Sequence, residues 1–215
     1  MAGSIDAGTM ARSDTMEHGR RKLDALEEAI AQHEPQRVAL DGEPMRAAVA
    51  MIFEPRDDDL HLFFIHRAEF AGDPWSGHMG FPGGRKDPED RDVLRTALRE
   101  VREEVGIDLD RQARLLAPLD EIQGVARGRQ LPLVISPFAF VLEAPVELCP
   151  NHEVQSTLWV PHGFLADRRN QSEMKYRVDD HDVYLPAYVF QDRTIWGLTF
   201  RMVQSLLDLL VCQKL

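Results

Sequence analysis

A single helix with two chemically different faces is the feature of this sequence that most limits its fold. The segment from Asp90 to Val105 has helical periodicity, and Gly106 follows where a helix commonly ends in a left-handed residue. Either Asp87 or Asp90 is expected to cap its start. At about 100° per residue, one face of this helix collects its apolar side chains, namely Leu94, Ala97, Leu98, Val101 and Val105. That face must pack against a hydrophobic core.

Three acidic side chains share another face of the same helix. Glu100, Glu103 and Glu104 are three and four residues apart, so they occupy neighbouring turns. Like charges placed in this way repel one another, and a hard divalent cation such as Mg²⁺ or Mn²⁺ reverses that penalty because it prefers carboxylate oxygens. The alternative is a solvated acidic face whose partners are the arginines of the helix, Arg95, Arg99 and Arg102.

The glycines that flank the helix favour metal binding, and the segment from Gly84 to Ile107 resembles the Nudix box. That box is written G-x5-E-x7-R-E-U-x-E-E-x-G-U, where U is aliphatic, and the run from Arg99 to Ile107 matches its second half without exception. The first half is one residue longer than the general pattern, and its Glu position falls among Asp87, Glu89 and Asp90. This longer form is similar to the coenzyme A diphosphatase branch of the family.

Similarity to that branch continues on both sides of the box. The upstream signature of the branch is L-L-T-x-R-[SA]-x3-R-x3-G-x3-F-P-G-G, and the residues kept from it are Arg67, Ala68, Gly77 and Phe81-Pro82-Gly83-Gly84. The loop is one residue longer, and Asp73 stands where the second Arg is expected. The downstream segments that also resemble the branch are 150–154, 158–161 and 195–199. The likeness spans residues 44 to 213.

The resemblance implies a fold and a reaction. The fold would be α+β, the α/β/α sandwich of mixed sheets of Nudix proteins, with an N-terminal helical extension. The reaction would be attack of water on a phosphorus of a diphosphate, with coenzyme A or an acyl-coenzyme A giving 3′,5′-ADP and 4′-phosphopantetheine. The alternatives are the same chemistry on ADP-ribose, a dinucleotide or a nucleoside triphosphate, and a silent Nudix-like domain that senses a nucleotide.

The resemblance also implies roles for individual residues. The Mg²⁺ or Mn²⁺ ligands would be Glu100, Glu103, Glu104 and the carbonyl of Gly84, whose lack of a side chain lets the backbone approach an ion. Glu103 and Glu104 would also act in catalysis, with Glu103 as a ligand or a base. Arg99 is expected to face away from the carboxylates and to orient Glu103 or the loop.

Four further positions are candidates for contact with substrate, namely Arg67, His78, Phe81 and Gly83. Arg67 would reach a phosphate, or else it is a surface charge at a strand edge. His78 would bond a phosphate, or its place in the loop is incidental. Trp75 and Phe81 would stack on an adenine or pack within the loop, and Trp196 is expected in the core. Glu153 is a candidate catalytic base or extra ligand, or a solvated loop carboxylate.

The rest of the chain divides into three parts: a disordered tail over 1–17, a helix and linker over 18–43, and the Nudix domain over 44–215. Strands are expected over 46–53 and 61–67 as a hairpin, then over 114–122, 131–142, 157–160, 183–190 and 194–196. The glycine-rich stretch 68–85 is expected to be a loop. A final amphipathic helix is expected over 199–213.

Composition excludes several other classes of function. The net charge of −11 argues against a protein that coats nucleic acid, so the expected partner is a small nucleotide diphosphate. No apolar run is long enough to span a membrane and no apolar signal segment begins the chain, which favours a cytoplasmic protein. Cys149 and Cys212 are expected to be buried thiols. A homodimer is compatible with all of this.

Overall fold

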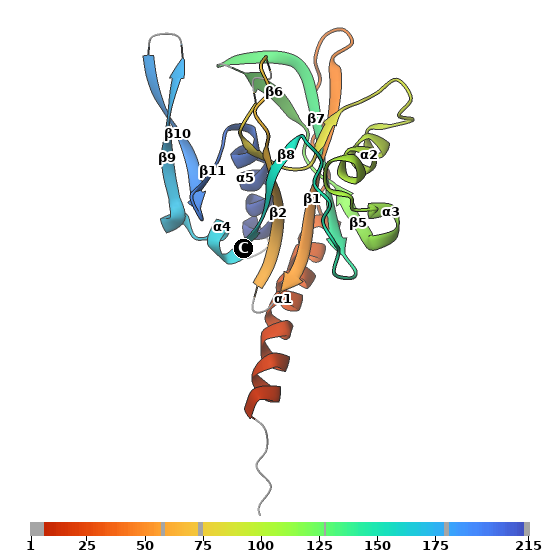
Figure 1. Ribbon diagram of the computed structural model, residues 1–215, viewed down its shortest axis with the longest axis vertical. Helices are drawn as coiled ribbons and strands as arrows, with labels where there is room; N and C mark the ends of the chain where they lie inside the picture. Colours follow the sequence, from red (N-terminus) through yellow and green to blue (C-terminus); the bar gives the residue numbers. More distant parts are fainter. Residues whose placement is uncertain (1–6, 57–58, 73–74, 127, 179–180, 213–215) are drawn as a thin grey trace, which may run out of the picture.

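The computed structural model of the chain describes residues 7–56, 59–72, 75–126, 128–178 and 181–212. A large mixed sheet lies between helices, and a smaller antiparallel sheet stands beside it (Figure 1). This is the α+β sandwich with an N-terminal helix that the resemblance implied.

Eight strands form the larger sheet: β1 (Met45–Arg56), β2 (Asp59–Arg67), β3 (Met79–Gly80), β4 (Gly83–Arg85), β5 (Ala113–Pro118), β6 (Ile122–Ala126), β7 (Arg129–Leu142) and β8 (Val154–Pro161). β1 and β2 form the predicted antiparallel hairpin. β1 also pairs in parallel with β7, which makes the sheet mixed. The smaller sheet contains β9 (Gln171–Val178), β10 (His181–Phe190) and β11 (Arg193–Trp196), with β10 in the middle.

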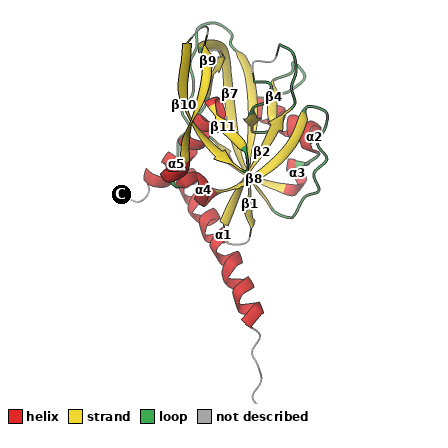
Figure 2. Ribbon diagram, turned by 60° about the vertical axis from the view of Figure 1, so that its left-hand side comes forward, coloured by secondary structure: helices red, strands yellow, loops and turns green. Residues whose placement is uncertain are grey.

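The helices of the described residues are α1 (Ala7–Ala31), α2 (Val93–Val105), α3 (Leu109–Gln112), α4 (His162–Ala166) and α5 (Gly197–Cys212). α2 and α3 lie on one side of the large sheet, and α1 and α5 lie on the other (Figure 2). Strand β1 serves both layers because its side chains alternate between the two faces. Ala50 and Ile52 pack in the core under α2, whereas Met51 and Phe53 pack in the core under α1 and α5.

Helix α2 has the two faces that the sequence predicts. Ala97, Val101 and Val105 are buried in the core against β1, and Gly106 ends the helix with a left-handed backbone, φ 78°. The N-cap is Asp92, whose side chain accepts a hydrogen bond from the backbone N–H of Arg95. The prediction of Asp87 or Asp90 as the cap was therefore wrong.

Several predicted boundaries differ from the structure. The strand predicted over 114–122 is two strands, β5 and β6, because the chain leaves β5 at Pro118 and Glu121 donates its backbone N–H to Gln36 of the linker. Strand β9 was not predicted, although Met174 and Tyr176 alternate with charged residues within it. The loop over 68–85 contains the short strands β3 and β4.

The ends of the chain also differ from prediction. Helix α1 begins at Ala7, within the segment predicted to be a tail, because good helix formers such as Met10, Ala11 and Arg12 allow the helix to continue upstream. Residues 1–6 and Asp73 lie outside the described residues. Cys149 is exposed rather than buried, because it lies in the loop that follows β7. No helix of the described residues is long and apolar enough to cross a membrane.

Candidate active site

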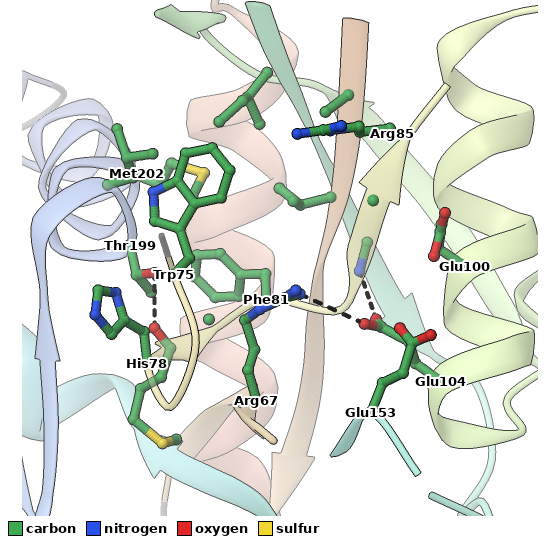
Figure 3. A pocket seen from close by; sticks show the side chains of 18 of the residues that line it. Arg67, Trp75, His78, Phe81, Arg85, Glu100, Glu104, Glu153, Thr199 and Met202 are labelled. Carbon is green, nitrogen blue, oxygen red and sulfur yellow. Dashed lines mark hydrogen bonds and ion pairs between the residues drawn. The ribbon is translucent and has the colours of Figure 1, made fainter. Parts of the chain in front are cut away.

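A cavity of about 460 Å³ opens where β4, the end of β2 and the acidic face of α2 meet the start of α5. Carboxylates lie on one side of it and aromatic and apolar side chains lie on the other (Figure 3). Of the predicted site residues, the cavity brings together Arg67, His78, Phe81, Gly83, Gly84, Glu100, Glu104 and Glu153. Arg99 and Glu103 are outside its lining.

Two glycines bring the backbone of β4 close to both the sheet and the helix. Gly83 has φ +150°, and a Cβ there would collide with the carbonyl oxygen of Ala48 on β1. A Cβ on Gly84 would collide with the carboxylate of Glu100. At Gly83 only glycine allows this approach, because the obstacle is the backbone of β1. At Gly84 the absence of a side chain lets the Glu100 carboxylate lie directly against the backbone.

Glu104 is the most buried carboxylate of the site, with 1% of its surface exposed. Its Oε2 accepts a hydrogen bond of 2.7 Å from the backbone N–H of Gly83, and its Oε1 lies 3.8 Å from Nη1 of Arg67. Burial raises the pKa of Glu104 to about 8, and the neighbouring carboxylates Glu100 and Glu153 add to the rise. The positive charge that the protein places near Glu104 is too small to keep it ionised. A bound cation would supply the missing charge and favour the carboxylate.

Arg99 connects the acidic helix to the loop that precedes it. Its Nη1 donates to Glu100 at 2.9 Å and to Glu103 at 3.0 Å, while Nε and Nη2 donate to the two oxygens of Asp90 at 3.1 and 2.9 Å. Nη2 also donates to the carbonyl of Arg85. Arg99 therefore contacts Glu103 and the loop, and it faces the carboxylates rather than away from them as predicted.

Glu153 reaches the site through backbone contacts of its loop. The N–H of Asn151 donates to the carbonyl of Glu104, and the carbonyl of Glu153 accepts from the N–H of Ala68 at the end of β2. These bonds attach the loop before β8 to both α2 and β2. The side chain of Glu153 lies beside Glu104 in the cavity (Figure 3) and is 46% exposed.

Two arginines bring positive charge to a protein whose net charge is −11. Arg67 points its guanidinium across the cavity toward Glu104, and Arg85 stands at the end of β4 (Figure 3). Both line the cavity. Arg85 was missed by sequence reasoning, although it follows the Gly83–Gly84 pair directly.

The side of the cavity away from the carboxylates is apolar and aromatic. His78 lies there, with its ring 4.5 Å from that of Trp196, so the structure does not place it beside the carboxylates (Figure 3). Phe81 is 4% exposed and stacks on Phe64 at 4.8 Å, so it packs in the core while one part of it lines the cavity. Trp75 lines the cavity as well.

Sequence reasoning missed much of this apolar side. Trp196 was expected in the core, yet it is partly exposed and lines the cavity, because β11 ends at the cavity and not beneath it. Met202 and Thr199 of α5 also line the cavity. Thr199 donates its hydroxyl to the carbonyl of Met79, which attaches the start of α5 to β3. A helical apolar stripe does not distinguish Met202 from an ordinary core residue.

No three His, Cys, Asp or Glu side chains within the described part of the chain gather into a group closed enough to hold an ion. Arg99 draws Glu100 and Glu103 toward itself, and Gly83 and Arg67 hold Glu104. The donor set nevertheless suits a hard divalent cation, since it consists of carboxylates beside the backbone of Gly84, whose carbonyl oxygen is a further possible ligand. The oxygen atoms needed are present on one side of one cavity.

The chain is similar to several known proteins. A family model described as the NUDIX domain matches residues 44–180. The mitochondrial coenzyme A diphosphatase NUDT8 of Homo sapiens is 34% identical over 178 residues, which cover 80% of this chain and 72% of that protein. The uncharacterized Nudix hydrolase NudL of Pectobacterium atrosepticum is 30% identical over 136 residues, which cover 61% of this chain and 66% of that protein.

Two further similarities concern a relative of greater length and a solved structure. An uncharacterized protein of Schizosaccharomyces pombe is 34% identical over 150 residues, so the chain spans 45% of that relative's length. A solved structure of a C. elegans Ap4A hydrolase has 21% identity and a TM-score of 0.46, covering 54% of this chain and 80% of that one. Because the family model matches more than half of this chain, the chain belongs to the Nudix family of hydrolases. These enzymes act on diphosphate bonds of small nucleotide compounds and generally use divalent metal ions.

Proposed function

We propose that this chain cleaves the diphosphate of coenzyme A or of an acyl-coenzyme A, giving 3′,5′-ADP and 4′-phosphopantetheine or its acyl derivative. The observation that carries the proposal is the division of one cavity into a carboxylate side with two arginines and an apolar, aromatic side. Coenzyme A has the same division, since a charged diphosphate joins an adenine nucleotide to a largely uncharged pantetheine arm. The similarity to a relative named as a coenzyme A diphosphatase supports the same substrate.

The proposed metal ligands are Glu100, Glu104 and the carbonyl of Gly84. Glu103 is 55% exposed and bonded to Arg99, so it would join them only after its side chain turns from that arginine. A bound Mg²⁺ or Mn²⁺ supplies polarisation of the phosphoryl oxygens, neutralisation of the leaving phosphate and a lower pKa for the attacking water.

The remaining roles are assigned to groups that the cavity contains. Glu153 is the proposed base that accepts the proton of the attacking water, because it lines the cavity and is not engaged by Arg99, whereas Glu103 lies outside the lining. Arg67 and Arg85, on the carboxylate side of the cavity, bind phosphate oxygens. Arg99 acts as a positioning residue, since it holds Glu100 and Asp90 in place.

A panel of diphosphates tests this proposal. Coenzyme A, ADP-ribose, a diadenosine polyphosphate and ATP are each incubated with the protein and Mg²⁺ or Mn²⁺, and the products are separated by chromatography. We expect 3′,5′-ADP from coenzyme A, with a kcat/KM at least about tenfold above that of any other compound, and no product after chelation of the metal. Preferential cleavage of ADP-ribose would replace the substrate assignment. A panel without any turnover would contradict the catalytic role.

We also propose a cytoplasmic location and a homodimer, both of which stay predictions. A relative that is named as mitochondrial makes the location worth testing directly. Fractionation of cells that express the tagged chain tests the location, and light scattering of the purified protein tests the dimer.

A further inference from the structure

A second cavity of about 450 Å³ lies next to the active-site cavity. It is bounded by the end of β6, by side chains of the small sheet and by the first turn of α5. The residues that line it are Trp75, His78, Val125, Ala126, Gly128, Tyr176, Val183, Leu185, Trp196, Gly197, Leu198 and Arg201. None of the residues to which the proposed reaction assigns a role is among them.

The two cavities adjoin through shared walls. Trp75, His78, Trp196 and Leu198 line both of them. Trp75 is fixed between the two because its indole N–H donates to the carbonyl of Val125 on β6 at 3.3 Å. The second cavity therefore begins at the apolar side of the active-site cavity, where these four residues separate the two.

The lining of the second cavity favours binding of an apolar group. Apart from His78 and the exposed Arg201, its side chains are aliphatic or aromatic. The rings of His78 and Tyr176 lie against Trp196 at 4.5 and 4.9 Å, and the indole N–H of Trp75 is already bonded. An adenine edge or a sugar would lose its hydrogen bonds to water here with few replacements, whereas an alkyl chain has none to lose.

We propose that this second cavity, the chain slot, binds an apolar chain carried by the non-nucleotide half of the substrate. Diphosphates that carry such a chain are then cleaved more efficiently than the same compounds without it. The inference rests on the proposed function, because the chain must extend from a diphosphate held beside Glu104.

Strand β10 offers a matched pair of positions for a test. Val183 and Leu185 line the chain slot, and Tyr184 between them is 62% exposed on the opposite side of the strand. Val183→Asp places a charge in the slot, and Val183→Trp fills the slot without a charge. Tyr184→Asp makes the same charge change outside the slot and is the control.

The first measurement compares kcat/KM for coenzyme A, butanoyl-coenzyme A and octanoyl-coenzyme A. Burial of methylene groups predicts a rise of roughly tenfold to a hundredfold from the unacylated to the octanoyl compound in the unmodified protein. The octanoyl to coenzyme A ratio should fall toward one in both Val183 variants and stay unchanged in Tyr184→Asp, with thermal unfolding confirming that each variant is folded. A ratio near one in the unmodified protein, or one that survives both Val183 variants, overturns the inference.

A second measurement separates the chain slot from the proposed reaction. Octanoyl-pantetheine has no diphosphate, so its binding to the full chain, followed by calorimetry, does not depend on turnover. We expect binding that weakens at least about tenfold in Val183→Asp and not in Tyr184→Asp. Binding with this pattern supports the chain slot even if coenzyme A is not cleaved, in which case only the proposed function fails. No binding to the unmodified protein overturns the chain slot even if coenzyme A is cleaved.

Discussion

Asp90 and Glu104 are both buried carboxylates of the same motif, yet their surroundings differ in a way that separates structure from chemistry. Asp90 accepts two hydrogen bonds from Arg99, one from the hydroxyl of Thr96 and one from the N–H of Asp87. The Arg99 bonds hold the pKa of Asp90 well below its usual range. Glu104 has the Gly83 N–H and an arginine at 3.8 Å, and burial raises its pKa to about 8.

This difference indicates which of the two carboxylates is stabilised fully by groups of the protein itself. The charge of Asp90 is matched by donors that belong to the protein, so the loop before α2 is held in place with no outside partner. The charge of Glu104 is matched only in part, and a perturbed carboxyl in a cavity is typical of a functional site. A divalent cation would complete the surroundings of Glu104 and has no place beside Asp90.

The largest expected effect is on turnover, from Glu104→Gln. The amide keeps the volume of the side chain but removes the charge that would bind a metal ion, so we expect kcat/KM to fall by on the order of a hundredfold or more. The unfolding free energy of the metal-free protein should stay the same or rise, since burial without a metal ion already disfavours the charged form of Glu104 and the amide is neutral at every pH. Assays of diphosphate cleavage and urea denaturation measure the two effects.

The exposed Glu89 provides the control for that variant, because Glu89→Gln makes the same chemical change outside the cavity. Its turnover should match that of the unmodified protein. If Glu104→Gln keeps more than half of the activity, Glu104 and Asp90 do not differ in the way proposed.

The converse change is Asp90→Asn, which should act first on stability. The amide retains one acceptor oxygen but loses the charge that Arg99 faces, so we expect the unfolding free energy to fall by about 2 kcal/mol. Turnover should fall by roughly tenfold, because Arg99 also positions Glu100. Urea denaturation gives the first value. Asp87→Asn is the control, since Asp87 is 64% exposed and 3.9 Å from Arg99, and it should change stability by less than about 0.5 kcal/mol.

The two faces of α2 could be predicted from sequence because they depend on local spacing. Residues three and four apart on a helix share a face wherever the helix lies, so the apolar stripe and the acidic face follow from periodicity alone. The choice of N-cap could not be predicted. Asp87, Asp90 and Asp92 all have a side chain suited to capping, and in the fold Arg99 binds Asp90 while Asp92 accepts the N–H of Arg95.

Contacts between distant segments could not be derived from spacing. Glu153 was identified by resemblance, and its approach to Glu104 depends on backbone bonds that join the loop before β8 to α2 and β2. Arg85 and Met202 were missed because a charge after two glycines and an apolar residue in a helix have ordinary structural explanations. Strand β9 was missed although Met174 and Tyr176 alternate with charged residues, and its pairing with β10 is a contact that spacing does not reveal.

The dependence of the unfolding free energy on pH tests the hydrogen bonds around Asp90, with a smaller expected effect than the substitutions above. The pKa of Asp90 in the folded protein lies below its ordinary value of 3.8. The stability that it contributes is therefore complete above that value and is lost as the pH falls below it toward the folded pKa. Urea denaturation from pH 5 down to pH 3 should show a loss that is shallower in Asp90→Asn, by no more than about 1 kcal/mol per pH unit. Equal slopes would mean that Asp90 is not held as an anion.

The smallest effect comes from Asp92→Ala, which removes the N-cap of α2. The loss of one cap bond to the N–H of Arg95 should lower the unfolding free energy by about 1 kcal/mol. Asp92→Ser should retain most of that stability, because a serine oxygen accepts the same bond, whereas neither change should alter turnover appreciably. Thermal unfolding of both variants measures this. The side chain of Asp92 accepts from Arg95 and Arg91, whereas the side chain of Asp90 accepts from Arg99, Thr96 and Asp87. Because the two side chains have different partners, the double variant with Asp90→Asn should show nearly additive losses. A loss much smaller than the sum would show that the cap and the Arg99 network stabilise the helix start as one unit.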